Sequence, residues 1–148
     1  MEKQVQTEWT RINEDHWRLD QDQVKSASKL LEGFDREKVE IIPITQREGS
    51  SSIAFAFTKI LDGIGSDIEE VLMDSTWKTN ALGYELFAIV GELNGQAIPL
   101  AFLLVTLTEA ANEGTKESIL RDFISWIAKQ CPKIKFTLTD KDVTEINA

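Results

Sequence analysis

Residues 84–107, YELFAIVGELNGQAIPLAFLLVTL, form the stretch of sequence that decides the fold. Two runs rich in Leu, Ile, Val and Phe lie on either side of Asn94 and Gly95, the dipeptide most typical of a two-residue hairpin turn. The pattern predicts two antiparallel strands, at residues 84–93 and 97–107, joined by that turn.

A third strand is expected before this hairpin. Val71, Leu72 and Met73 form a continuous apolar run that ends directly at Asp74, which is typical of a central strand buried on both faces. Together with the hairpin, this run predicts a meander of three antiparallel strands.

A helix and a fourth strand follow the meander. Apolar residues recur at helical spacing from residue 115 until Pro132 ends the pattern, and residues 134–139 then alternate between apolar and polar side chains up to Asp140. Because strand-helix-strand crossovers are right-handed, the fourth strand is expected beside the first and parallel to it. This topology would place Asp74 and Asp140 side by side. The predicted fold class is therefore α/β, with a mixed sheet.

Residues 1–65 are predicted to form a helical N-terminal region beside a core that spans residues 66–148. Asp20 and Gln23 resemble a capping box at the start of a helix, and Gly33 marks its expected end. Residues before this helix carry a more diluted helical pattern.

Two further segments of the N-terminal region have their own patterns. Residues 39–44, interrupted by Pro43, suit an edge strand or an extended link. Apolar residues at helical intervals in residues 53–61 predict an amphipathic helix closed by Gly63 and Gly65.

Composition and charge limit the classes of function. The 148 residues suit one domain, and the formal charge of -9 opposes autonomous binding to a phosphate backbone. The longest apolar runs are too short to cross a bilayer, so no membrane association is expected. The single cysteine, Cys131, excludes an internal disulfide and fits a reducing compartment. We expect an intracellular protein, nuclear in a eukaryote.

The Asp74 and Asp140 carboxylates are the candidate chemical groups. Two carboxylates on adjacent strands disfavour joint ionisation unless a cation lies between them. Mg²⁺ prefers oxygen ligands and is commonly held by one or two protein carboxylates together with substrate phosphates. In two-metal nucleases such ions activate the attacking oxygen and stabilise the leaving one, and a third acidic ligand is normally needed.

Structural alternatives exist for both residues. An Asp after a strand is commonly a turn former or a helix N-cap, and for Asp140 alone this interpretation is favoured. For Asp74 the two interpretations are evenly balanced, because an unpaired carboxylate buried in a strand would be expensive. Asp142 ranks second to Asp140 as a ligand, and His16, the only histidine, gives little basis for nucleophilic catalysis.

The motifs around these residues resemble the Mutator-like element (MULE) transposase domain of fungal type. The resemblance extends from residue 68 to the last residue, and residues 17–65 resemble the region that adjoins that domain. The stretches that carry it are MDSTWKTN at residues 73–80, GYEL at 83–86, IPLAF at 98–102, TDKD at 139–142 and EINA at 145–148.

This resemblance implies an RNase H-like core with an Asp-Asp-Glu triad that binds Mg²⁺ or Mn²⁺ in a two-metal arrangement and cuts and joins DNA. Asp74 matches the first Asp of the triad and Asp140 the second. The family's third carboxylate lies well beyond the second Asp, whereas this chain ends at Ala148. A C-terminally truncated core is therefore expected, with weak or absent metal binding and little or no strand transfer in isolation. The implied partner is DNA at transposon ends, which full-length members bind.

Three functions stay open at this point. The leading one is a partial transposase core whose ancestral reaction is metal-dependent DNA cleavage and strand transfer. The second is a non-catalytic, domesticated or degenerate protein-interaction domain, which the acidic charge and the missing third carboxylate favour. The third is a nuclease of another RNase H-like lineage. Whether the chain is an enzyme is left undecided, and self-association through the exposed sheet edge at the fourth strand is expected.

Overall fold

The computed structural model describes residues 7–8, 10–12, 18–35, 37–77 and 80–139 of the chain. Its centre is a six-stranded sheet in the order β1-β2-β5-β4-β3-β6. The strands are β1 (Glu40–Ile41), β2 (Ser50–Ala56), β3 (Glu70–Thr76), β4 (Glu85–Leu93), β5 (Gln96–Leu107) and β6 (Phe136–Thr139). The helices are α2 (Gln23–Glu32), α3 (Thr58–Ile64), the 3-10 turn Gly65–Asp67 and α4 (Thr115–Gln130).

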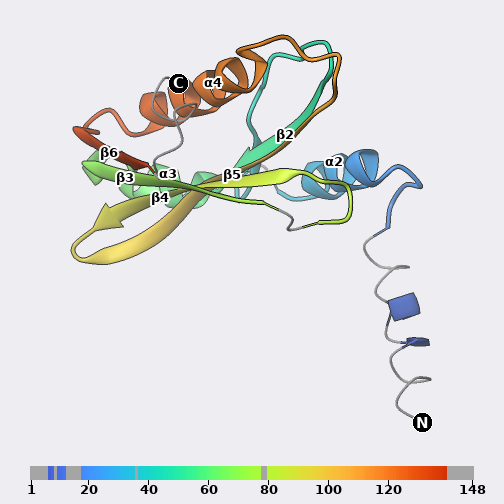
Figure 1. The fold of residues 1–148 in the computed structure, drawn as a ribbon. Helices are drawn as coiled ribbons and strands as arrows, with labels where there is room; N and C mark the ends of the chain where they lie inside the picture. Colours follow the sequence, from blue (N-terminus) through green and yellow to red (C-terminus); the bar gives the residue numbers. More distant parts are fainter. Residues whose placement is uncertain (1–6, 9, 13–17, 36, 78–79, 140–148) are drawn as a thin grey trace.

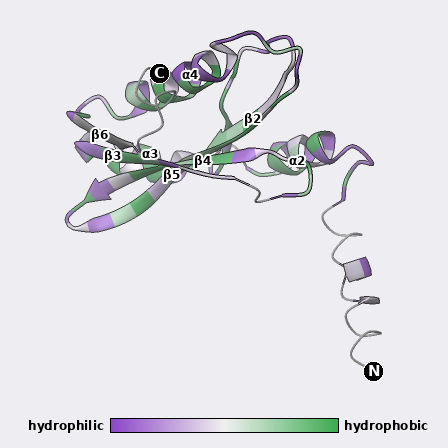
Figure 2. Ribbon diagram, in the orientation of Figure 1, coloured by the Kyte–Doolittle hydropathy of each residue, from purple (hydrophilic) through white to green (hydrophobic). Residues whose placement is uncertain are grey.

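The predicted meander is confirmed. Strands β3, β4 and β5 pair antiparallel in sequence order. Between β4 and β5, Asn94 and Gly95 have φ values of 53° and 79°. Positive φ at both central residues is what a type I′ turn requires. Figure 2 shows hydrophilic residues near the turn end of this hairpin, whereas its strands are mostly hydrophobic.

The predicted crossover is confirmed as well. Helix α4 follows β5 and lies across one face of the sheet (Figure 1). Strand β6 then pairs parallel to β3, with Thr139 aligned to Met73. The backbone N–H of Lys135 donates to the carbonyl of Glu69 at 2.8 Å and starts this pairing. The mixed α/β sheet is therefore the one that the sequence pattern predicts.

The N-terminal third contributes strands to the same sheet. Strand β2 pairs antiparallel with β5, placing Ile53 opposite Leu104, and β1 forms the outer edge. The helix predicted over residues 53–61 is therefore wrong in its first half, since α3 starts only at Thr58. Apolar residues at positions 53 and 57 fit a helical period locally, but pairing with β5 satisfies the backbone of residues 50–56. The domain boundary at residue 65 stays a prediction.

The other N-terminal expectations are closer to the structure. Asp22 is the N-cap of α2, and its carboxylate accepts from the backbone N–H groups of Val24 and Lys25. The N-cap thus lies two residues after the predicted one, Asp20, and Gly33 is the C-cap as expected. Residues 7–8 and 10–12 are helical, and the edge strand expected within residues 39–44 is β1.

The core lies between α4 and one face of the sheet. Phe123 and Ile127 of α4, together with Phe87 and Leu103 from the central strands, are each at most 1% exposed. Gly91 allows Ile68 to pack closely, because a Cβ at this glycine would lie 2.7 Å from the Ile68 Cδ1. No helix in the described part of the chain is long and apolar enough to cross a membrane.

One prediction about β3 is wrong, and the error changes the description of the candidate site. Val71 and Met73 are buried, but Leu72 is 43% exposed and Asp74 is exposed. The strand is therefore buried on one face only, because α4 covers that face, whereas the contacts of α2 with the sheet are mainly to β1 and β2. We call the side of the sheet away from α4 the open face.

Candidate functional site

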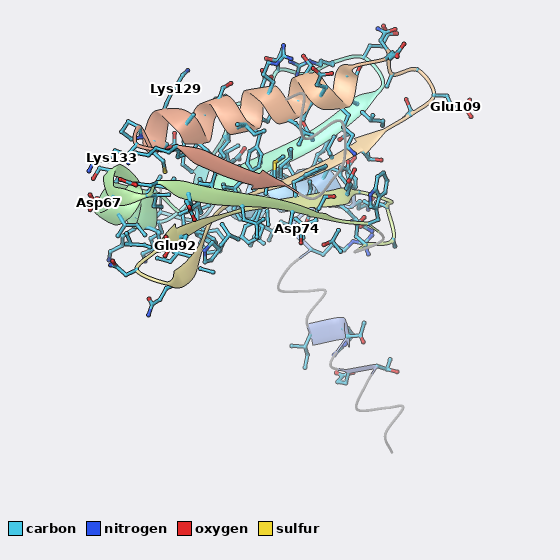
Figure 3. The ribbon with its side chains drawn as sticks, turned by 60° about the vertical axis from the view of Figure 1, so that its left-hand side comes forward. Asp67, Asp74, Glu92, Glu109, Lys129 and Lys133 are labelled. Carbon is cyan, nitrogen blue, oxygen red and sulfur yellow. The ribbon has the colours of Figure 1, made fainter. Side chains whose placement is uncertain are left out.

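Asp74 lies on the open face, near the C-terminal end of β3. It is opposite Ala88 of β4, and its side chain is exposed on the side away from α4 (Figure 3). No ion pair to Asp74 is found within the described residues. The carboxylate therefore keeps its hydration and its capacity to accept a cation, and the expected penalty for burying it does not arise.

The position of β6 bears on the second predicted ligand. Met73 and Thr139 are partners in the parallel pair of β3 and β6. Each immediately precedes a predicted ligand, Asp74 in one strand and Asp140 in the other. Adjacent strands lie about 4.8 Å apart, so the two chain segments are close where each predicted ligand begins. Asp140, and its ranked substitute Asp142, lie outside the described residues, and their role as ligands stays a prediction.

In the part of the chain that the structure describes, acidic residues do not cluster around Asp74. Within the described ranges, no group of three or more His, Cys, Asp or Glu side chains is arranged to hold a metal ion. Asp67 and Glu69, at the opposite end of β3, are ion-paired to Lys133 and Lys135 at 3.4 and 2.9 Å. These acidic residues therefore tie β3 to the segment leading into β6. His16 lies outside the described residues.

A buried ion pair at the end of the sheet was not predicted. Glu85, the first residue of β4, has a side chain only 3% exposed, and its Oε2 lies 2.9 Å from the Nζ of Lys116 in the first turn of α4. The same Nζ lies 5.1 Å from the ring centroid of Trp77 and 5.2 Å from that of Phe87. One ammonium therefore joins α4 to β4 and to the residue that follows β3.

The signal for this pair was present in the sequence. Glu85, Phe87 and Ile89 alternate with residues of the other face, so Glu85 occupies a position where the strand pattern points into the core. A glutamate there requires a cation, and only the fold identifies Lys116 as that cation. The remaining oxygen of Glu85, Oε1, is buried and has no hydrogen-bond partner among the described residues.

The turn that leads into β4 is held by Asn80 and Tyr84. The Asn80 side chain donates to the carbonyl of Tyr84 and accepts from the backbone N–H groups of Leu82 and Tyr84, all within 3.1 Å. The Tyr84 hydroxyl donates to the Ser51 hydroxyl at 2.7 Å. These bonds fix the start of β4 and therefore position Glu85. Trp77, just before this turn, is 62% exposed.

Two of the groups with displaced pKa values, Asp122 and Cys131, lie on α4 or at its end. Burial acts to raise the pKa of Asp122, but the backbone N–H of Thr45 and the guanidinium of Arg47 donate to its carboxylate at 3.1 and 3.0 Å, and the net effect lowers it. Burial raises the pKa of the Cys131 thiol. A neutral, buried thiol is a poor nucleophile, so Cys131 has a packing role.

Comparisons with known proteins agree with the observed fold. Residues 68–148, more than half of the chain, match the family described as Zinc finger SWIM domain-containing protein 1/3, RNaseH-like domain. The chain is also 28% identical to the Mating-type protein ALPHA3 of the yeast Kluyveromyces lactis over 149 aligned residues. That alignment covers 95% of this chain but only 16% of the length of the relative. No solved structure matches the chain.

Proposed function

Since the chain belongs to the RNaseH-like domain family of zinc finger SWIM domain-containing proteins 1 and 3, we propose that it is a transposase-type core whose ancestral chemistry is metal-dependent cleavage and joining of DNA. The family match shows an RNaseH-like domain, and it supports an origin related to nucleases and transposases. The fungal MULE lineage, the Asp-Asp-Glu site and the DNA substrate are parts of the proposal.

The observation that carries the proposal is the arrangement of β3 and β6. An exposed carboxylate, Asp74, lies on a central strand, and Thr139 of the parallel partner strand is aligned with Met73, the residue before Asp74. Asp140 follows directly in the sequence. Asp74 has no ion pair within the described residues, which is what a carboxylate reserved for a cation requires.

The donor chemistry fits Mg²⁺ or Mn²⁺. Asp74 and Asp140 would hold the ion through carboxylate oxygens, the ligands that these hard cations prefer. When bound, such an ion lowers the pKa of a coordinated water and neutralises charge on a phosphodiester in the transition state. With two protein carboxylates, we expect weak binding in the isolated chain.

The surrounding residues would position this site rather than react. Lys116 neutralises Glu85 beneath Trp77, so the end of β3 is held against the first turn of α4. Lys116 is turned toward Glu85 on the face of the sheet opposite to Asp74, and it therefore does not compete with a cation there.

Calorimetric titration of Mn²⁺ into the full chain tests this proposal. We expect weak, saturable heats for the wild type, reduced to the dilution background by Asp74→Asn and by Asp140→Asn. Glu109→Gln, which removes an exposed acidic residue far from β3 (Figure 3), is the matched control and should keep the wild-type heats. Equal heats for the wild type and Asp74→Asn would remove Asp74 from the site.

A second candidate function is that of a domesticated, non-catalytic interaction domain. It is favoured by the similarity to a protein named for mating type and by the formal charge of -9. If the chain is such an interaction domain, its fold and any partner binding should be unchanged by Mn²⁺ or by Asp74→Asn. DNA binding, a nuclear location and the activity of any longer protein are likewise proposals, since the chain spans 16% of the relative's length.

A further inference from the structure

A large part of the open face is apolar and is not covered by any of the residues that the structure describes. A groove of about 470 Å³ lies between α2 and the central strands. It is lined by Val24 and Ala27 of α2, Phe55 of β2, Phe102 and Leu104 of β5, and Leu86 of β4. Phe55 and Phe102 stack at 5.6 Å between ring centroids, so the floor of the groove is pre-formed.

The apolar surface continues beyond the groove along β4. Leu86, Ala88 and Val90 are only partly buried and share the open face. Across from Val90 lies Leu72, which is 43% exposed. The strip therefore runs along β4 from the groove toward the β4-β5 turn.

The strip ends at two acidic residues. Glu70 of β3 and Glu92 of β4 are direct partners in the antiparallel pair, and both are exposed. Like charges opposite each other in a sheet are destabilising. No ion pair to either residue is found within the described part of the chain. An occupant that brings cations would relieve this repulsion.

We propose that the open face binds an amphipathic α-helix of a partner protein, with its apolar side along Leu86, Ala88 and Val90 and a cluster of Lys or Arg at the end that reaches Glu70 and Glu92. From Leu86 to Glu92 the strand extends about 20 Å, which corresponds to a helix of about 13 residues. A helix lying in an apolar groove with charges at its end is an established mode of recognition.

The charge at Glu70 and Glu92 selects this occupant over two others. A second copy of this chain would add its own formal charge of -9 to the same surface. A nucleic acid would present phosphates to the two glutamates, which raises the repulsion further. A basic helix lowers it. This inference does not depend on the metal site proposed above.

The test uses the full chain and a synthetic, fluorescein-labelled peptide of about 14 residues with Leu at helical i, i+3, i+4 and i+7 spacing and an arginine cluster at one end. We expect saturable binding by fluorescence anisotropy in the micromolar range. The pair Glu70→Lys and Glu92→Lys should weaken binding at least about tenfold. A peptide with the same apolar side but a glutamate cluster should not bind.

The matched control separates this site from a general attraction to an acidic protein. Glu109→Lys with Glu113→Lys changes the net charge equally but lies in the exposed segment before α4 (Figure 3). This pair should change affinity less than about twofold. Because Glu92 also accepts a hydrogen bond from the Gly95 N–H, Glu70→Lys alone serves as a second variant that leaves the hairpin intact.

Amide chemical shifts locate the bound peptide. Residues 86–90 and 102–104 should shift on titration, whereas α4 should not. Equal losses from both pairs of substitutions, or shifts centred elsewhere, would each overturn the proposal.

Discussion

Lys116→Met should be among the most damaging single substitutions of a partly exposed residue in this protein. Lys116 is 17% exposed and its Nζ lies 2.9 Å from the Oε2 of Glu85, whose side chain is 3% exposed. At that distance and an effective dielectric constant of about 20, the attraction is about 6 kcal/mol before desolvation is subtracted. Removing the lysine leaves a buried carboxylate without a cation, and we expect a loss of about 3 kcal/mol in the free energy of unfolding.

The reverse substitution should be milder. Glu85→Gln leaves a lysine that is nearer the surface and can be hydrated, so we expect a loss of about 1.5 kcal/mol. The double variant should cost clearly less than the sum of the two single losses, because neither charge then remains buried alone. Urea unfolding, followed by circular dichroism, gives the free energy of unfolding of the wild type, the two single variants and the double variant. The comparison requires that this free energy has the same dependence on urea concentration in all four proteins. If the free energy of unfolding of Lys116→Met lies within about 0.5 kcal/mol of the wild-type value, the pair behaves as a surface ion pair, which refutes the prediction.

Three further predictions concern the scaffold. Gly49→Ala should lower the free energy of unfolding by more than about 2 kcal/mol, because φ at Gly49 is 70° and a Cβ would lie 2.2 Å from the Ala111 N. A thermal unfolding temperature equal to that of the wild type would refute the clash. The lowered pKa of Asp122 adds stability that is present above about pH 4 and is lost as the pH falls through the lowered value. Above about pH 4, Asp122→Asn should therefore unfold at a lower denaturant concentration than the wild type. In strong acid the two proteins should unfold at the same concentration. Cys131 should react with a thiol reagent only on unfolding, and rapid native labelling would contradict its burial.

The hairpin and the crossover were predictable because their signals are local. Asn94 and Gly95 specify a turn by their tolerance of positive φ, and the residues on both sides have the length and composition of strands. The parallel placement of β6 then follows from the handedness of crossovers. These features require no knowledge of distant contacts.

The features that were predicted wrongly or missed have a common physical cause. Residues 53–56 fit a helical period, yet they form a strand because β5 offers backbone partners that the sequence does not reveal. Asp74 was expected in a strand buried on both faces. An apolar run alone does not show how many faces of a strand are covered, and β3 is buried on one face only. The Glu85 and Lys116 pair likewise depends on the packing of α4 against β4. Tertiary contacts decide each case.

The most direct test of the proposed metal site is paramagnetic broadening of backbone amides by Mn²⁺. Substoichiometric Mn²⁺ should first broaden the amides of Met73, Ser75 and Thr139, and Asp74→Asn should abolish this pattern. The β3 and β6 pairing places these amides within reach of one ion. Broadening centred elsewhere, or broadening of the same amides that persists in Asp74→Asn, would contradict the claim that Asp74 holds the ion.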